Sequence, residues 1–133
     1  MSQPVSVPAP VLSAATPVKQ PKAAIGPTPV FADKVDYGVG DGPFSVAVVD
    51  VNADGRPDLV TANWDSDDVS LLLNQGNGRF ASETRLAVGN SPRSIASVDV
   101  NGDGRPDLVT ANWDSNDVSL LLNQGNGRFA SET

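Results

Sequence analysis

Two short stretches of the chain concentrate oxygen-bearing side chains at alternating positions. The first reads DVNADGRPDL from Asp50 to Leu59, and the second reads DVNGDGRPDL from Asp99 to Leu108. Counted from the first aspartate, each stretch carries Asp, Asn, Asp and Asp at positions 1, 3, 5 and 9, with glycine at position 6. If the backbone turns sharply at that glycine, the alternating side chains point into one concavity. The pattern therefore predicts a loop that binds a cation.

Calcium is the cation that fits this predicted loop best. The side chains at positions 1, 3, 5 and 9 and the backbone carbonyl at position 7 supply about six to seven oxygens when water or a bidentate carboxylate is included, which suits Ca²⁺ better than Mg²⁺. Three carboxylates within nine residues also repel one another without a counter-ion. A solvated Asx-rich turn is the alternative reading of a single copy, but two copies in one register favour the metal. Two Ca²⁺ ions per chain are expected, and the predicted ligands are Asp50, Asn52, Asp54, Arg56 and Asp58 in the first loop and Asp99, Asn101, Asp103, Arg105 and Asp107 in the second.

The composition removes several other classes of function. The 133 residues include no cysteine and no histidine, so disulfides, thiolate sites and the commonest general base are excluded. The formal net charge of -7 argues against nucleic acid and anionic membrane surfaces as partners. No apolar run approaches the roughly 18 residues needed to span a bilayer. Ser70 and Ser119 lie in apolar runs without a His or Lys placed to activate them, so we expect no enzyme activity.

The chain divides into a proline-rich part and a repeated part. Residues 1–30 contain most of the 11 prolines and are expected to form an extended tail or linker. Residues 50–84 and 99–133 differ only in Ala53 against Gly102 and in Asp67 against Asn116. We therefore expect two blade repeats within residues 31–133, at about 44–84 and 93–133, with a partial repeat strand at 31–40.

Each repeat is expected to form a four-stranded antiparallel sheet. Its apolar runs are short, β-branched and separated by turn signals, and Asn77-Gly78 supplies the positive φ angles of a tight hairpin. Four such strands make a propeller blade, and propellers close with about 4 to 8 blades. Two blades leave apolar faces unpaired, so the predicted fold is all-β, with two four-stranded antiparallel propeller-type blades completed by oligomerisation. The strands expected in the first repeat are 45–51, 57–64, 68–74 and 79–84.

The loop and the strands together resemble a known family. The pattern DxNxDGxxDL, followed by a strand, an Asn-rich turn, VSLLLN and a glycine turn ending in Phe, is similar to the FG-GAP or VCBS-type repeat. Such repeats build the β-propellers of integrin α-subunits and of many bacterial surface and secreted proteins. The resemblance covers residues 31–133 and implies Ca²⁺ in each hairpin loop, with the ligands named above. Propellers of this family usually contain seven blades in one chain, whereas two complete units stand here.

A calcium-binding structural or binding module is the expected function. Free calcium is millimolar outside the cell and matches weak modular sites, so an extracellular or cell-surface complex is expected, although MSQPVSVPAP shows no secretory signal. The expected partners are further copies of the chain, or a larger protein assembly, bound through blade faces. The alternative is a propeller lectin, in which Trp64 and Trp113 stack on a glycan between blades rather than on the next blade. A fragment of a secreted hydrolase or lyase has the least support.

Overall fold

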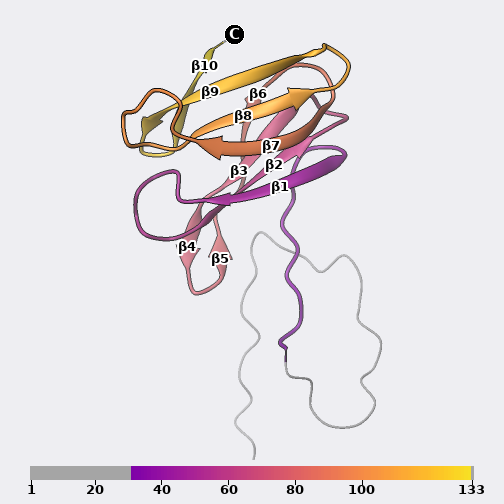
Figure 1. Ribbon diagram of the computed structural model, residues 1–133. Helices are drawn as coiled ribbons and strands as arrows, with labels where there is room; N and C mark the ends of the chain where they lie inside the picture. The colour runs from indigo at the N-terminus through magenta and orange to yellow at the C-terminus, as the bar shows by residue number, and fades with distance from the viewer. Residues whose placement is uncertain (1–30, 133) are drawn as a thin grey trace, which may run out of the picture. The chain divides into compact units, whose positions relative to one another are not determined.

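The computed structural model describes residues 31–132, and the regular structure in this range consists of β-strands alone (Figure 1). The strands belong to a compact unit, Gly38–Thr133, which is separate from the unit that ends at Tyr37. Within the described range, no helix is long and apolar enough to cross a membrane. The tail predicted at 1–30 lies outside the described residues.

The first repeat forms a four-stranded antiparallel sheet with the strand order β1-β2-β3-β6. A small hairpin, β4-β5, follows β3, and Asn77 and Gly78 at its tip have φ angles of 56° and 73°. Both angles are positive, as the Asn-Gly pair predicts for a tight turn. The strands are β1 (Pro43–Val49), β2 (Asp58–Asn63), β3 (Asp68–Leu72), β4 (Asn74–Gly76), β5 (Arg79–Phe80) and β6 (Thr84–Ala87).

The second repeat forms a sheet of the same kind, with the order β10-β9-β8-β7. The prediction of an all-β fold with two four-stranded antiparallel sheets is therefore confirmed, and the sheets are consistent with propeller blades. The strands of this sheet are β7 (Pro92–Val98), β8 (Asp107–Asn112), β9 (Asp117–Gly125) and β10 (Arg128–Glu132).

The outer strand of the first sheet differs from the predicted 79–84. It is β6, and Thr84 pairs with Leu71, whereas the register of the second sheet would place Glu83 at that position. The additional residue makes a bulge, which breaks the predicted strand into β5 and β6. The bulge brings Glu83 to Ser70, whose hydroxyl donates a 2.6 Å hydrogen bond to Glu83 Oε2. This hydrogen bond accompanies the shifted register of the first sheet.

The partial repeat strand predicted at 31–40 is not formed, and the first strand begins at Pro43. A strand needs a hydrogen-bonded neighbour. In the complete repeats that neighbour includes the run VSLLLN, and no such run precedes residue 31 in the sequence. The two residues Phe31-Ala32 that match Phe80-Ala81 are too few to specify a strand by themselves.

The two sheets share one hydrophobic core. Strand β7 of the second sheet contacts β1 and β2 of the first, and Figure 1 shows the two sheets stacked in this way. Burial of apolar side chains between the sheets makes the two repeats a single folded body. The buried core residues are Val51, Val60, Ala62, Val69 and Leu71 from the first repeat and Ile95, Leu108 and Leu121 from the second.

Candidate metal site

Each acidic loop joins the first two strands of its sheet. The first loop lies between β1 and β2, where Val49 pairs with Asp58, and the second lies at the equivalent place between β7 and β8. The glycine at position 6 has a positive φ in both loops, 82° at Gly55 and 84° at Gly104. The sharp turn that the sequence predicts at this glycine is therefore present. It allows each loop to connect two strands that pair with each other.

The aspartate at position 1 organises the first loop through backbone hydrogen bonds. Asp50 Oδ1 accepts from the N–H of Asp54 at 3.3 Å, and Asp50 Oδ2 accepts from the N–H of Gly55 at 2.8 Å. Asp54 Oδ1 in turn accepts from the N–H of Arg56 at 2.9 Å. These bonds hold the curled loop conformation, and the carboxylates retain further lone pairs.

The amide of Asn52 lies between two of the predicted carboxylate ligands. One of its terminal atoms is 3.1 Å from Asp50 Oδ1 and 3.0 Å from Asp54 Oδ1. When the amide nitrogen occupies this place, it donates to both carboxylates; when the oxygen does, three oxygens face one another. With the nitrogen in this place the carboxylates are satisfied without an ion, and with the oxygen turned inward the three residues would offer hard oxygens to a cation such as Ca²⁺. Positions 1, 3 and 5 are thus brought together.

The second loop repeats this arrangement with two more backbone hydrogen bonds. Asp99 Oδ1 accepts from the N–H of Gly102 at 2.9 Å and of Asp103 at 3.2 Å, and Asp99 Oδ2 accepts from Gly104 at 2.8 Å. The bond from Gly104, supported by those from Asp103 and Gly102, holds the pKa of the Asp99 carboxyl below its usual value. Asn101 Oδ1 accepts from the N–H of Asp103 at 3.4 Å. Asp99 therefore stays ionised at neutral pH, as a metal ligand must.

The aspartate at position 9 is fully buried and has structural partners of its own. Asp58 Oδ2 accepts from the N–H of Val51 at 2.9 Å, and Asp58 Oδ1 accepts from the N–H of Asn74 at 2.8 Å. Asp107 makes the same pair of bonds at its position, to Val100 and Asn123. Each carboxylate thus joins the start of its loop to a more distant strand, β4 in the first repeat and β9 in the second.

Carboxylates alone do not form a metal site in this part of the chain. Within residues 31–132, no three acidic side chains converge closely enough to hold a metal. The predicted ligand set adds an asparagine oxygen and a main-chain carbonyl to the carboxylates at positions 1, 5 and 9. The arginines at position 7 place their side chains near position 5, with Arg56 Nη1 3.6 Å from Asp54 Oδ2 and Arg105 Nη1 3.5 Å from Asp103 Oδ2. Exposed pairs of this kind contribute only about 0 to 1 kcal/mol.

The two loops differ in backbone strain at position 4. Ala53 has a φ of 61° and Gly102 a φ of 75°, so both occupy the left-handed region. An alanine in this region costs roughly 1 kcal/mol, because its Cβ approaches the backbone, whereas glycine does not have this cost. The first loop is therefore the more strained of the two.

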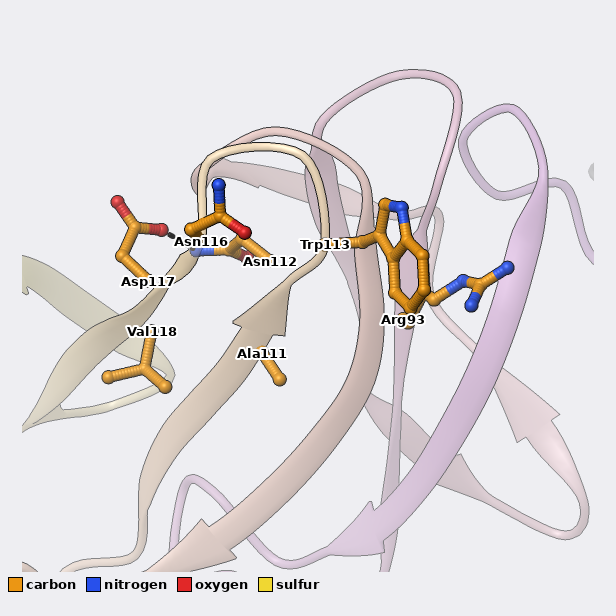
Figure 2. Close-up of a pocket in the computed structure, with 7 residues that line it drawn as sticks. All are labelled: Arg93, Ala111, Asn112, Trp113, Asn116, Asp117 and Val118. Carbon is orange, nitrogen blue, oxygen red and sulfur yellow. Dashed lines mark hydrogen bonds between the residues drawn. The ribbon is translucent and has the colours of Figure 1, made fainter.

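The two repeated tryptophans lie away from the acidic loops, at the turns after β2 and β8. Trp113 lines a pocket of about 440 Å³, which is formed by residues of β7, β8, β9 and the turn between β8 and β9. The Arg93 guanidinium lies over the Trp113 ring, 4.2 Å from its centroid, and Figure 2 shows the two side chains at one end of the pocket. Trp64 is less exposed than Trp113. The remaining lining residues are Ala111, Asn112, Asn116, Asp117 and Val118.

A buried polar cluster at the same end of each sheet was not found by sequence reasoning. Asn63 accepts from Thr61 Oγ1 and donates to Asp68 Oδ1 and Ser70 Oγ at 2.8 and 2.9 Å. A Cβ at Gly40 would lie 2.5 Å from Asn63 Nδ2, so this glycine must remain without a side chain. The signal that could have revealed the cluster is the exact recurrence of TANWDS, since a repeated polar run after an apolar strand needs partners.

The matching cluster in the second sheet affects one titratable group. Hydrogen bonds from Asn112 Nδ2 and Ser115 Oγ lower the pKa of Asp117. The bond from Asn112 to Asp117 is drawn in Figure 2. Asp117 therefore presents a negative charge to the pocket beside Trp113 at neutral pH.

Comparison with known proteins identifies the repeats. Residues 50–110 and 99–133 match the family described as FG-GAP-like repeat. The matched segments begin at the first aspartates of the two acidic loops and together cover more than half of the chain. Searches among curated proteins and among solved structures gave no significant match.

Proposed function

The chain belongs to the FG-GAP-like repeat family, and on that premise we propose that it is a calcium-binding structural module that assembles into a larger complex outside the cell. The observation that carries the proposal is the convergence of Asp50, Asn52 and Asp54 in a loop already curled by backbone hydrogen bonds. Repeats of this family often bind Ca²⁺. The module would use the ions for structure rather than for catalysis.

Bound calcium would supply charge neutralisation and a link between loop positions. Asp50, Asn52 and Asp54 would hold the ion in the first loop, and Asp99, Asn101 and Asp103 would hold it in the second. Two divalent ions would change the formal charge from -7 to -3 (-7 + 4). Because each loop connects paired strands, fixing the loop fixes the register of its sheet.

The proposed absence of enzyme activity is supported by the state of Ser70. Its hydroxyl donates to Glu83 Oε2 and accepts from Asn63 Nδ2 and from the N–H of Gly40. A nucleophilic serine needs a base that removes its proton and space for the substrate. The buried hydroxyl of Ser70 is instead committed to the polar cluster.

Calorimetric titration with calcium tests the proposal. We expect two ions per chain, one at each loop. The variant Ala53→Gly gives the first loop the residue of the second and should still bind two ions, while raising the stability of the chain by roughly 1 kcal/mol with or without calcium. Asp54→Asn with Asp103→Asn is the matched control and should abolish binding at both loops. Absence of calcium binding by the unmodified chain would overturn the proposal.

The pocket beside Trp113 supports glycan binding as a second candidate function. An exposed indole next to Asn116 and Asp117 combines a stacking surface with polar groups, which suits a sugar ring. On this hypothesis Trp113→Ala abolishes retention on a glycan surface, while Trp64→Ala, at a less exposed indole, has a smaller effect. Arg93 already covers one face of the Trp113 ring, which reduces the stacking area and makes this candidate the weaker one. A chain that is retained on no glycan would exclude it.

A further inference from the structure

Comparison of the near-identical repeats shows how much exposed surface one sheet loses when the next sheet covers it. Val69 in the first repeat is 0% exposed, while its counterpart Val118 in the second is 63% exposed. Val51 is 2% exposed and its counterpart Val100 is 47% exposed. Since the residue types are the same, the difference measures the coverage of the first sheet by the second. We call the uncovered surface of the second sheet the C-terminal face; it consists of Val98, Val100, Ala111, Trp113 and Val118.

The first sheet also has an uncovered surface, on the side that faces away from the second sheet. Val46 on β1 is 60% exposed, whereas Ile95, its counterpart on β7, is 7% exposed because it packs into the shared core. Likewise, Pro43 is exposed, whereas its counterpart Pro92 is buried. We call this surface the N-terminal face; it consists of Phe44, Val46 and Val48.

We infer that the C-terminal face of one copy docks on the N-terminal face of a second copy. A second copy is the expected partner because the same kind of interface already exists inside the chain. The C-terminal face corresponds to the side of the first sheet that packs on the second, and the N-terminal face corresponds to the side of the second sheet that packs on the first. Such a contact is heterologous, so it repeats head to tail and ends only when a ring closes. With about 4 to 8 blades in a closed propeller, the ring contains two to four chains. The inference deepens the proposed function and rests on it.

Polar groups at the new junction have counterparts in the existing one. Within the chain, the N–H of Ser91 donates to Asp67 Oδ1 at 2.8 Å across the two repeats. The corresponding groups on the uncovered faces are the N–H of Gly42 and the amide of Asn116, whose oxygen can accept the same bond. The exchange of Asp67 for Asn116 therefore preserves the acceptor that the junction needs.

A second polar link connects the junction to the acidic loops. Asn123 Nδ2 donates to Val51 O and to Pro106 O, both at 2.9 Å. Its counterpart Asn74 donates from Nδ2 to Pro57 O at 2.8 Å, and no second acceptor is recorded for it within residues 31–132. At the junction the remaining N–H of Asn74 would donate to the carbonyl of Val100 in the neighbouring copy. Val100 is position 2 of the second acidic loop, so this loop forms part of the docking surface.

The contact between Arg93 and Phe44 also has a counterpart at the junction between two copies. Inside the chain, the Arg93 guanidinium lies 5.0 Å from the centroid of the Phe44 ring. At the junction, Arg93 of one copy takes the place of Phe44, and Phe44 of the next copy takes the place of Arg93. A cation–π contact therefore forms in both settings. Arg93 Nε is buried without a hydrogen-bond partner, and the guanidinium lies over the Phe44 and Trp113 rings instead.

Two complementary variants of the full chain test the inference by light-scattering mass in calcium buffer. Val46→Glu damages only the N-terminal face, and Val118→Glu damages only the C-terminal face. The unmodified chain should have the mass of two to four copies, and each variant alone should be monomeric. An equimolar mixture should form one 1:1 complex, because an intact face remains on each partner. Both valines are largely exposed, so folding of the single chain should be unaffected.

The controls separate this inference from the other possibilities. Gln124→Glu adds the same charge at an exposed position outside both faces and should leave the mass unchanged. Val48→Glu with Val98→Glu provides a second complementary pair. A monomeric unmodified chain, a mixture that does not associate, or a Val118→Glu variant that still dimerises would overturn head-to-tail docking. Calcium titration of Val118→Glu should still find two ions, so failure of docking is distinguished from failure of calcium binding.

Discussion

Removal of calcium with EDTA is expected to lower the free energy of unfolding of the chain by about 5 kcal/mol. A ligand at a hundredfold excess over its dissociation constant stabilises the folded state by about 2.7 kcal/mol per site, and two sites are proposed. Without the ions, the loop carboxylates Asp50 and Asp54 repel each other at the turn that holds β1 and β2 together. For a folded unit of this size, the midpoint of thermal unfolding should fall by roughly 20 °C or more.

The measurement compares thermal and urea unfolding in calcium and in EDTA. The monomeric variant Val118→Glu should be included, because association would otherwise add its own stabilisation by mass action. The control variant Asp54→Asn with Asp103→Asn should unfold at nearly the same temperature in both buffers. Equal stability of the unmodified chain in calcium and in EDTA would show that bound metal does not stabilise the loops.

Asp58→Asn is expected to destabilise the chain by about 3 kcal/mol even in EDTA. The carboxylate is fully buried and accepts from the N–H groups of Val51 and Asn74. The amide retains one acceptor oxygen but turns an NH₂ group toward the other N–H, which loses a charge-assisted bond and leaves a buried donor unpaired. Asp107→Asn should behave similarly, because Asp107 makes the equivalent pair of bonds.

Urea unfolding in EDTA separates this structural role from calcium coordination. Asp54→Asn is the control, since its exposed carboxylate should matter little when no ion is present, within about 0.5 kcal/mol. If Asp58→Asn and Asp54→Asn lose stability only in calcium buffer, Asp58 acts through the metal and its buried hydrogen bonds contribute little.

The local features of the fold could be predicted because they depend on residues close in sequence. The β-branched runs specified the strands, Gly55 specified the loop turn, and Asn77-Gly78 specified the hairpin. The two-sheet architecture followed from the repetition of these signals. The family resemblance rested on the same short patterns, and it was confirmed over residues 50–133.

Features that depend on distant residues could not be predicted in the same way. The bonds of Asp58 reach Asn74, which is 16 residues away, and a position-9 aspartate carries no local sign of that partner. The displaced strand β6 is accompanied by a hydrogen bond between Ser70 and Glu83, which lie 13 residues apart. The repeats are nearly identical, so sequence assigns Val69 and Val118 one environment, whereas their position in the stack gives them opposite ones.

The amide of Asn123 has a consequence for how the two calcium ions would bind. Its Nδ2 donates to Val51 O in the first loop and to Pro106 O in the second, so one side chain bridges both loops. When an ion orders one loop, it should also restrict this side chain. The other loop then loses less conformational entropy when it binds its own ion. By linkage, each ion then strengthens the binding of the other by the same factor, and the pair of loops should fill cooperatively.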